Sequence, residues 1–305
     1  MRDAPQPQRP GTARRVLGVS LAVSLLAAAV YAALAGRSPG DPSPWDALRG
    51  DPWRALSLVA FPACSTLLTA LAFLHLTRRF GRVPAADMLA LITAANLLNY
   101  LPLRPGLLGR VWFHSAVHGI AVRHSARIVG ESVALAALGF ALAAVALVPG
   151  LPAHAPYTMP LSLAAACLAL APVARSRPSL APAAPYLVPL GIKLIDTALW
   201  AGRYWVCFGL LGVPLSPASA LALALVAQSA SLVPIAGNGL GLREWAVALF
   251  ASFLPEIPLN VTLTADLANR AAELVFAVPT GLIASAYLAR RLRPHGRGTT
   301  PSALG

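Results

Sequence analysis

Uninterrupted apolar runs dominate this chain, and they show neither the alternation of a half-buried strand nor the single stripe of a surface helix. The clearest runs cover residues 16–35, 55–77, 128–149, 157–173, 186–211 and 261–289. Each approaches the ~20 residues that cross ~30 Å of hydrocarbon at about 1.5 Å per residue. The first exceeds the ~7–15 apolar residues of a cleavable signal peptide, so we expect it to be retained. The pattern predicts an all-α polytopic membrane protein with about six full spans.

Two further apolar stretches, residues 85–112 and 217–256, are broken near their middle. The residues at the breaks are Pro102, Pro105, Gly106 and Gly109 in the first stretch and Pro234, Gly237, Gly239 and Gly241 in the second. Proline removes a backbone donor and glycine permits a tight reversal, so neither stretch fits a straight helix. Non-helical backbone at membrane depth survives only against protein or water. We therefore expect two re-entrant hairpins.

The composition supports a membrane protein and excludes other classes. Hydrophobic residues make up 57% and charged residues 11% of the chain, whereas a soluble domain has about 25% charged residues. Soluble enzymes, disulfide scaffolds, disordered chains and nucleic-acid-binding modules are therefore poor fits, and no nucleic-acid partner is expected. The cysteines Cys64, Cys167 and Cys207 lie in apolar runs without a CxxC pattern and predict neither a metal site nor a disulfide.

The net charge of +13 gives the expected orientation. With the N-terminus inside and both broken stretches re-entrant, most basic residues lie on the cytoplasmic side, as the positive-inside rule requires. Residues 1–15 and 294–305 are then cytoplasmic tails around one transmembrane domain, residues 16–293. Its halves, about 16–149 and 157–289, become inverted repeats whose broken segments correspond. Such paired breaks point to a transport site near the bilayer midplane.

Sequence motifs for catalysis are absent. His114 and His118 are four residues apart within residues 111–124, which we expect to form a helix on the inner interface. The two histidines could share a metal, but HSAVH lacks the glutamate of a zinc-protease motif and a third ligand, so a polar helix face is the favoured interpretation. The chain also has no phosphate-binding loop and no nucleophile elbow. We expect no enzyme activity and no cofactor.

Ionisable residues inside the apolar runs are the most informative positions, because each costs about 2.5–3.5 kcal/mol at the centre of a membrane helix. They are Glu131, Lys193, Asp196, Arg203, Arg243, Glu244, Asp266, Arg270 and Glu273. One interpretation is structural, in which opposite charges such as Lys193 and Asp196 pair and lock helices together.

A second interpretation is functional and concerns Arg104, Arg110, Arg243 and Arg270. These four arginines flank or face the two breaks. A guanidinium group is permanently charged and matches the geometry of phosphate. Backbone N–H groups at the glycine breaks add affinity for anions. We favour this interpretation for the four arginines.

The same residues carry a resemblance to a known family. The segments PIAGNGLGLREW (234–245) and NYLPLRPGLLGR (99–110) resemble motifs of the lysylphosphatidylglycerol synthase transmembrane-domain family, also called flippase-like. Arg270, followed by Pro279 and Gly281, is similar to its last-span pattern, and Glu131 stands where the family has a Glu-Arg pair. Three positions depart from the family pattern, namely Leu107, Ser132 and Leu135. The chain has no room for the soluble synthase domain, so the synthase activity does not carry over.

The resemblance implies a multi-pass protein of the bacterial inner membrane that binds and translocates a phosphate-bearing lipid: a phospholipid, an aminoacyl lipid or a polyprenyl-phosphate carrier. The four arginines would meet the phosphate in turn, and a separate lipid-modifying enzyme is a conceivable partner. The expected substrate-binding residues beside them are Asn99, Pro102, Gly106, Gly109, Pro234, Asn238, Gly239, Gly241 and Glu244. Charge balance or proton coupling is expected from Glu131, Lys193, Asp196, Arg203, Asp266 and Glu273.

Three other functions stay open at the level of sequence. A proton-coupled transporter of a small anion would share the inverted repeat but needs an enclosed cavity. An intramembrane enzyme acting on a lipid carrier would need an acid–base pair, for which Glu244 and Glu131 are the plausible bases. An accessory subunit would use the buried charges only to pack helices.

Overall fold

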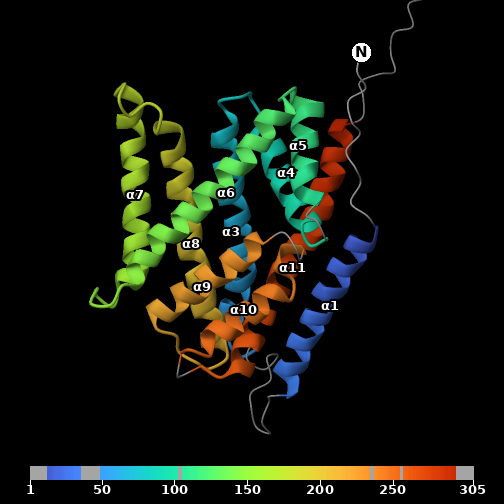
Figure 1. The fold of residues 1–305 in the computed structure, drawn as a ribbon, viewed down its shortest axis with the longest axis vertical. Coiled ribbons are helices and arrows are strands. Elements are labelled where there is room, and N and C mark those ends of the chain that lie inside the picture. Colours follow the sequence, from blue (N-terminus) through green and yellow to red (C-terminus); the bar gives the residue numbers. More distant parts are fainter. Residues whose placement is uncertain (1–11, 36–48, 102–104, 234–236, 255–256, 293–305) are drawn as a thin grey trace, which may run out of the picture.

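The computed structural model describes residues 12–35, 49–101, 105–233, 237–254 and 257–292 (Figure 1). Within these residues every regular element is a helix and no strand occurs. The expected all-α fold is therefore confirmed. Prolines and caps set several helix starts. For example, Asp51 accepts a hydrogen bond from the backbone N–H of Arg54 in front of α3 (Pro52–Thr77), and Ser216 does the same for Ser219 in front of α9 (Pro217–Leu232).

Four helices have the length and apolar composition needed to cross a membrane. They are α3, α6 (Val122–Ala144) with the short 3-10 helix η1 (Val145–Leu147), α7 (Ala155–Ser176) and α11 (Leu259–Leu292). These helices support a helical, multi-pass membrane protein. Another helix, α8 (Ala184–Leu210), is as long but carries Lys193, Asp196 and Arg203. Helix α1 (Thr12–Ala35) includes the apolar helical stretch Val23–Ala35. The expectation of six full spans thus stays a prediction.

Both broken stretches form pairs of short helices. The first consists of α4 (Ala85–Leu98) and α5 (Pro105–His118). The second consists of α9, the 3-10 turn η2 (Gly237–Gly239) and α10 (Leu242–Ala251). None of these helices has the ~20 residues of a full span. In Figure 1 the α4–α5 pair lies toward one end of the long axis of the molecule and the α9–α10 pair toward the other.

The expected interfacial helix at residues 111–124 does not exist as a separate element. Residues up to His118 continue α5, and α6 begins at Val122. Gly119, with φ +66°, makes the turn between them, because this left-handed conformation favours glycine. His114 is consequently buried, at 2% exposed, where a polar interfacial face was expected.

Helices α8 and α11 hold the bundle together. α8 packs against α3, α6, α7, α9 and α11, while α11 also packs against α1, α4 and α10. Two glycines allow close helix approach. A Cβ on Gly106 of α5 would collide with the carbonyl oxygen of Ala95 on α4, and one on Gly281 of α11 would lie 2.6 Å from the Cβ of Leu97. The first broken pair is therefore fixed tightly against α11.

Candidate functional site

Two adjacent polar regions occupy the interior between α8, α9 and α11. We call the first the arginine–carboxylate cluster; its members are Arg203, Tyr204, Arg243, Glu244, Asp266, Asn269, Arg270 and Glu273. We call the second the polar cavity, a space of about 260 Å³ bounded by α3, α4, α6, α8, α9 and α11. The two regions differ in how their charged groups are paired.

Arg243 is the most buried arginine of the cluster, at 1% exposed. Its Nε donates to Oδ2 of Asp266 at 3.0 Å and its Nη1 donates to Oε1 of Glu273 at 2.8 Å. The hydroxyl of Tyr204 donates to the other oxygen of Asp266. Arg243 reaches this position because Gly241, at φ +76°, turns the chain into α10 just before it.

Glu273 joins the parts of the cluster. Its two carboxylate oxygens accept from Arg203 at 2.8 Å, from Arg243 at 2.8 Å and from Arg270 at 3.3 Å. The hydroxyl of Tyr100, which follows α4, adds a fourth bond at 3.0 Å.

Arg270 connects α11 to the second break. Its Nε donates to Oε1 of Glu244 at 2.9 Å, and its Nη1 donates to the carbonyl oxygen of Asn238 at 3.2 Å. Asn238 and the following Gly239 both have left-handed backbone, at φ +46° and +71°. The break at η2 is thus held by an arginine from a different helix.

The charges of the cluster balance. The guanidinium groups of Arg203, Arg243 and Arg270 face the carboxylates of Glu244, Asp266 and Glu273. Asn269 on α11 completes the set, since its Oδ1 accepts from Nε of Arg203 at 2.9 Å. Such a network pairs the desolvated charges with one another, although Nη2 of Arg270, Oε2 of Glu244 and Nδ2 of Asn269 have no hydrogen-bond partner among the described residues. Removal of one partner leaves a buried charge without its counter-charge.

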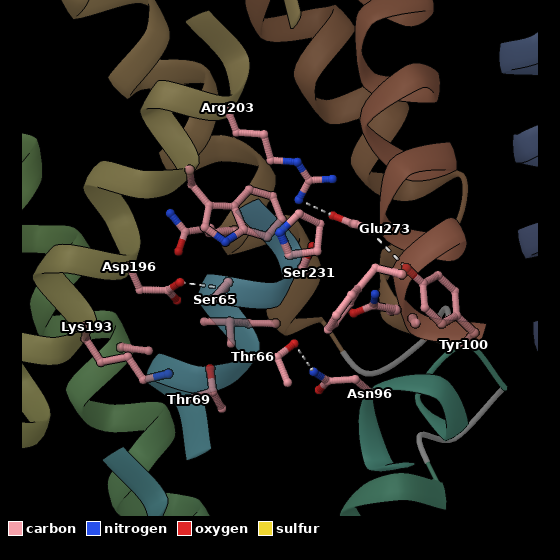
Figure 2. A pocket seen from close by; sticks show the side chains of 18 of the residues that line it. Ser65, Thr66, Thr69, Asn96, Tyr100, Lys193, Asp196, Arg203, Ser231 and Glu273 are labelled. Atoms are coloured by element: carbon pink, nitrogen blue, oxygen red, sulfur yellow. Dashed lines mark hydrogen bonds and ion pairs between the residues drawn. The ribbon is translucent and has the colours of Figure 1, made fainter. Parts of the chain in front are cut away.

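The polar cavity is lined mainly by uncharged polar and aromatic side chains. Figure 2 shows Ser65 on α3 bonded to Asp196 on α8, and Thr66 on α3 bonded to Asn96 on α4. The other lining residues of the cavity include Thr69, Tyr100, Phe140, Lys193, Trp200, Arg203, Gln228, Ser231, Asn238 and Glu273. The cavity and the cluster therefore share a boundary at Arg203, Asn238 and Glu273.

Lys193 is a charged residue of the cavity wall. Its amino group makes no hydrogen bond and no ion pair with any residue that the structure describes. Asp196, one turn along α8, is bound instead to the hydroxyl of Ser65 on α3 at 2.5 Å. Gln228 on α9 presents a second unused donor, since its buried Nε2 also lacks a hydrogen-bond partner. Buried donors without partners are rare in folded proteins and indicate a site for a ligand or water.

Trp200 separates the two regions on the α8 side. The guanidinium carbons of Arg203 and Arg243 lie 5.1 and 5.6 Å from the centre of its ring. Both distances are within the range of cation–π attraction. Because Trp200 also lines the cavity, its ring is an apolar wall between the bonded arginines and the open space.

The remaining candidate residues lie elsewhere. Glu131 on α6 binds Arg79, Arg127 and Tyr186 and has no contact with the cluster. Asn99, Gly106, Gly109 and Arg110 belong to the α4–α5 pair, where the guanidinium of Arg110 lies 4.8 Å from the centre of the Phe73 ring. Pro102, Arg104 and Pro234 fall outside the described residues. The structure thus brings the second-half candidates together around the cluster and the cavity.

The histidine pair of α5 forms no metal site. His114 is bonded to the hydroxyl of Ser125 at 3.1 Å, and His118 lies 3.5 Å from Asp87. Among the described residues no group of three or more His, Cys, Asp or Glu side chains could hold a metal ion.

A search of the sequence for charged residues does not find several residues of the cavity wall. Ser65, Thr66, Asn96, Trp200 and Gln228 all lie inside apolar helices. Asn96 and Gln228 are amides in otherwise apolar runs, and this was the signal that could have found them. Comparisons with family models, curated proteins and solved structures find no match for this chain.

Proposed function

We propose that this chain binds a lipid with a phosphate-bearing headgroup in the polar cavity and translocates it across a bacterial inner membrane. The single observation that carries the proposal is the amino group of Lys193, which lines a cavity inside a membrane-type helical bundle without a hydrogen bond or ion pair to any described residue. A cation inside the bundle without an ion pair is costly, and an anionic headgroup lowers that cost by forming a charge-assisted hydrogen bond.

Lys193 meets the phosphate in this proposal, with Gln228 as a second donor. The side chains of Ser65, Thr66, Asn96 and Ser231 surround the same space and supply hydrogen bonds to the polar part of the headgroup. The cavity volume of about 260 Å³ suits a headgroup and excludes the hydrocarbon chains. The chains therefore stay outside the cavity, in the lipid phase.

The arginines of the cluster have a different role from the one expected of them. Arg243 and Arg270 are bonded to carboxylates, so a phosphate could reach them only by displacing Asp266, Glu244 or Glu273. We propose that the cluster holds α8, α10 and α11 in place, and that its members on the cavity wall, Arg203 and Glu273, sense the arriving headgroup. Direct contact of Arg104 or Arg110 with phosphate stays a prediction.

The membrane arrangement is part of the same proposal. The α4–α5 and α9–α10 pairs are re-entrant hairpins that enter from opposite faces, α1 and α8 complete six spans, and both termini are cytoplasmic. In this proposal the chain is a member of the lysylphosphatidylglycerol synthase transmembrane-domain, or flippase-like, family that its motifs resemble. The position of the two pairs toward opposite ends of the molecule supports it (Figure 1).

A reconstitution experiment tests the proposal. The purified protein is placed in vesicles of phosphatidylethanolamine and phosphatidylglycerol that contain phosphatidylglycerol with a fluorescent group on one acyl chain, and dithionite reports the label that reaches the outer leaflet. We expect the wild type to move the label and Lys193→Met to slow it by about tenfold or more, since a hydrogen bond to a charged group contributes about 1.5–3 kcal/mol. The control is Arg54→Ala, which removes an exposed ion pair with Asp51.

The same vesicles separate the lipid from a small soluble anion. If the wild type takes up phosphate or sulfate and leaves the labelled lipid in place, the protein is an anion transporter and the lipid proposal is wrong. If Lys193→Met moves the label as fast as the wild type, the headgroup does not bind where we place it.

A further inference from the structure

An apolar groove lies beside the polar cavity on the outer side of the bundle. It has a volume of about 660 Å³ and runs between α6, α9 and α10. Its lining is small and apolar, with Ala141 and Ala144 on α6 and Ala230 on α9, and Ser229 is its one hydroxyl-bearing residue. The volume falls within the ~300–1,000 Å³ of ordinary ligand sites.

The groove and the cavity meet at one residue. Phe140 of α6 lines both spaces, and no other residue that the structure describes does so. Along α9 the two linings interleave, since Gln228 and Ser231 face the cavity while Ser229 and Ala230 face the groove. We call the line along which α6 and α9 meet the seam. The polar cavity lies on its inner side and the apolar groove on its outer side, with the ring of Phe140 between them.

We infer that this groove binds one hydrocarbon chain of the lipid whose headgroup occupies the polar cavity, and that the seam between α6 and α9, at Phe140, is where the lipid enters and leaves sideways. The inference rests on the proposed function, because it assigns the tail of the same lipid. An amphipathic ligand needs two adjoining spaces of opposite polarity, and this is what Phe140 joins. A soluble anion would have no use for the groove.

The groove can be filled without touching the cavity or the cluster. Ala144 and Ser229 are exposed and line the groove, so Ala144→Trp and Ser229→Trp each put a large ring into the space. Ala134 is also an exposed alanine of α6 but lines neither space, and its distance from Ala144 is about 15 Å along the helix. Ala134→Trp is therefore the matched control for a tryptophan at an exposed position of α6 outside the groove.

Two measurements on the full-length protein are compared. Native mass spectrometry of detergent-purified protein counts the lipids that stay bound, and the dithionite assay in phosphatidylethanolamine–phosphatidylglycerol vesicles gives the rate of lipid movement. We expect Ala144→Trp and Ser229→Trp each to lose a lipid that the wild type and Ala134→Trp retain, and to slow the movement of acyl-labelled phosphatidylglycerol by about tenfold.

The outcomes separate this inference from the proposed function. If both groove variants retain lipid and move the label like Ala134→Trp, the groove is not the tail site, even though the cavity proposal stands. If the groove variants lose the retained lipid but the wild type moves no label, the tail site is supported and translocation is wrong. Using two variants on different helices protects the test against a single misfolded protein.

Discussion

The arginine–carboxylate cluster and the polar cavity lie side by side, but their charged side chains differ in whether they form ion pairs. In the cluster, Arg243 is 1% exposed and bonded to two carboxylates. In the cavity, Lys193 has no such partner among the described residues, although Asp196 is one turn away. The same helix, α8, supplies Arg203 to one region and Lys193 to the other.

The difference indicates what each region is for. In a network of paired buried charges each charge is balanced by its neighbours, so the main contribution of the network is to fix helix positions. A charge inside the bundle that no ion pair balances destabilises the protein alone and is retained where a ligand supplies the missing partner. The ion pairs distinguish the two regions, because Arg203, Arg243 and Arg270 each have a carboxylate within ion-pair distance and Lys193 has none among the described residues.

The largest expected effect is on the cluster. Arg243→Met leaves Asp266 and Glu273 with one cation fewer in a buried site, and breaking such a network costs about 3–5 kcal/mol. We expect a large loss of thermal stability in detergent, measured by tryptophan fluorescence or by size-exclusion chromatography after heating. Arg54→Ala is the control, since its exposed pair with Asp51 contributes about 0–1 kcal/mol. Equal melting of the two variants would contradict a structural role for the cluster.

A second substitution should rescue part of that loss. Asp266→Asn added to Arg243→Met removes one charge of each sign and leaves Arg203 and Arg270 facing Glu244 and Glu273. We expect the double variant to be more stable than the sum of the two single losses predicts, with a coupling of about 1–3 kcal/mol in a double-mutant cycle. A coupling near zero would mean that Arg243 and Asp266 do not act as a pair.

Lys193→Met should have a much smaller effect on stability. Because its amino group has no hydrogen bond or ion pair to lose among the described residues, we expect the melting midpoint to stay the same or rise, with a change in unfolding free energy within about 1 kcal/mol. Lipid movement should nevertheless fall by about tenfold. A loss of stability as large as that of Arg243→Met would place Lys193 in the structural network instead.

The smallest effect on stability is expected at Gln228. Gln228→Leu keeps the approximate size and removes a buried donor that lacks a partner, so the unfolding free energy should change by less than about 1 kcal/mol. If Gln228 is a second donor to the headgroup, lipid movement slows by about threefold to tenfold. Leu232→Gln, on the same stretch of the cavity wall, is the reciprocal control, and it should not slow movement to the same extent.

The helices could be predicted from the sequence because the signal is long and local. The apolar runs at 55–77, 157–173 and 186–211 coincide within a few residues with α3, α7 and α8. Gly237, Gly239 and Gly241 lie between α9 and α10, as the second break predicts, whereas Pro105, Gly106 and Gly109 of the first break fall inside α5. The prediction of a separate interfacial helix was wrong because residues 111–118 continue a helix that begins at Pro105. Periodicity alone does not show where a helix starts.

The candidate site was only partly predictable. Asp266, Arg270 and Glu273 share a face of one helix, so the spacing alone places them together, as α11 does. The partners of Lys193 and Asp196 depend on tertiary packing. Their spacing on α8 suits a pair, but Asp196 binds Ser65 of α3, which no local pattern indicates. Asn96 and Gln228 carry no charge, and their importance follows only from the cavity that they line.

A structure of the protein in nanodiscs of phosphatidylethanolamine and phosphatidylglycerol tests the division between the two regions most directly. We predict headgroup density within hydrogen-bonding distance of Nζ of Lys193, while Arg243 remains bonded to Asp266 and Glu273. Density that displaces these carboxylates from Arg243 or Arg270, or a lipid-free cavity with Lys193 turned toward Asp196, would contradict the account.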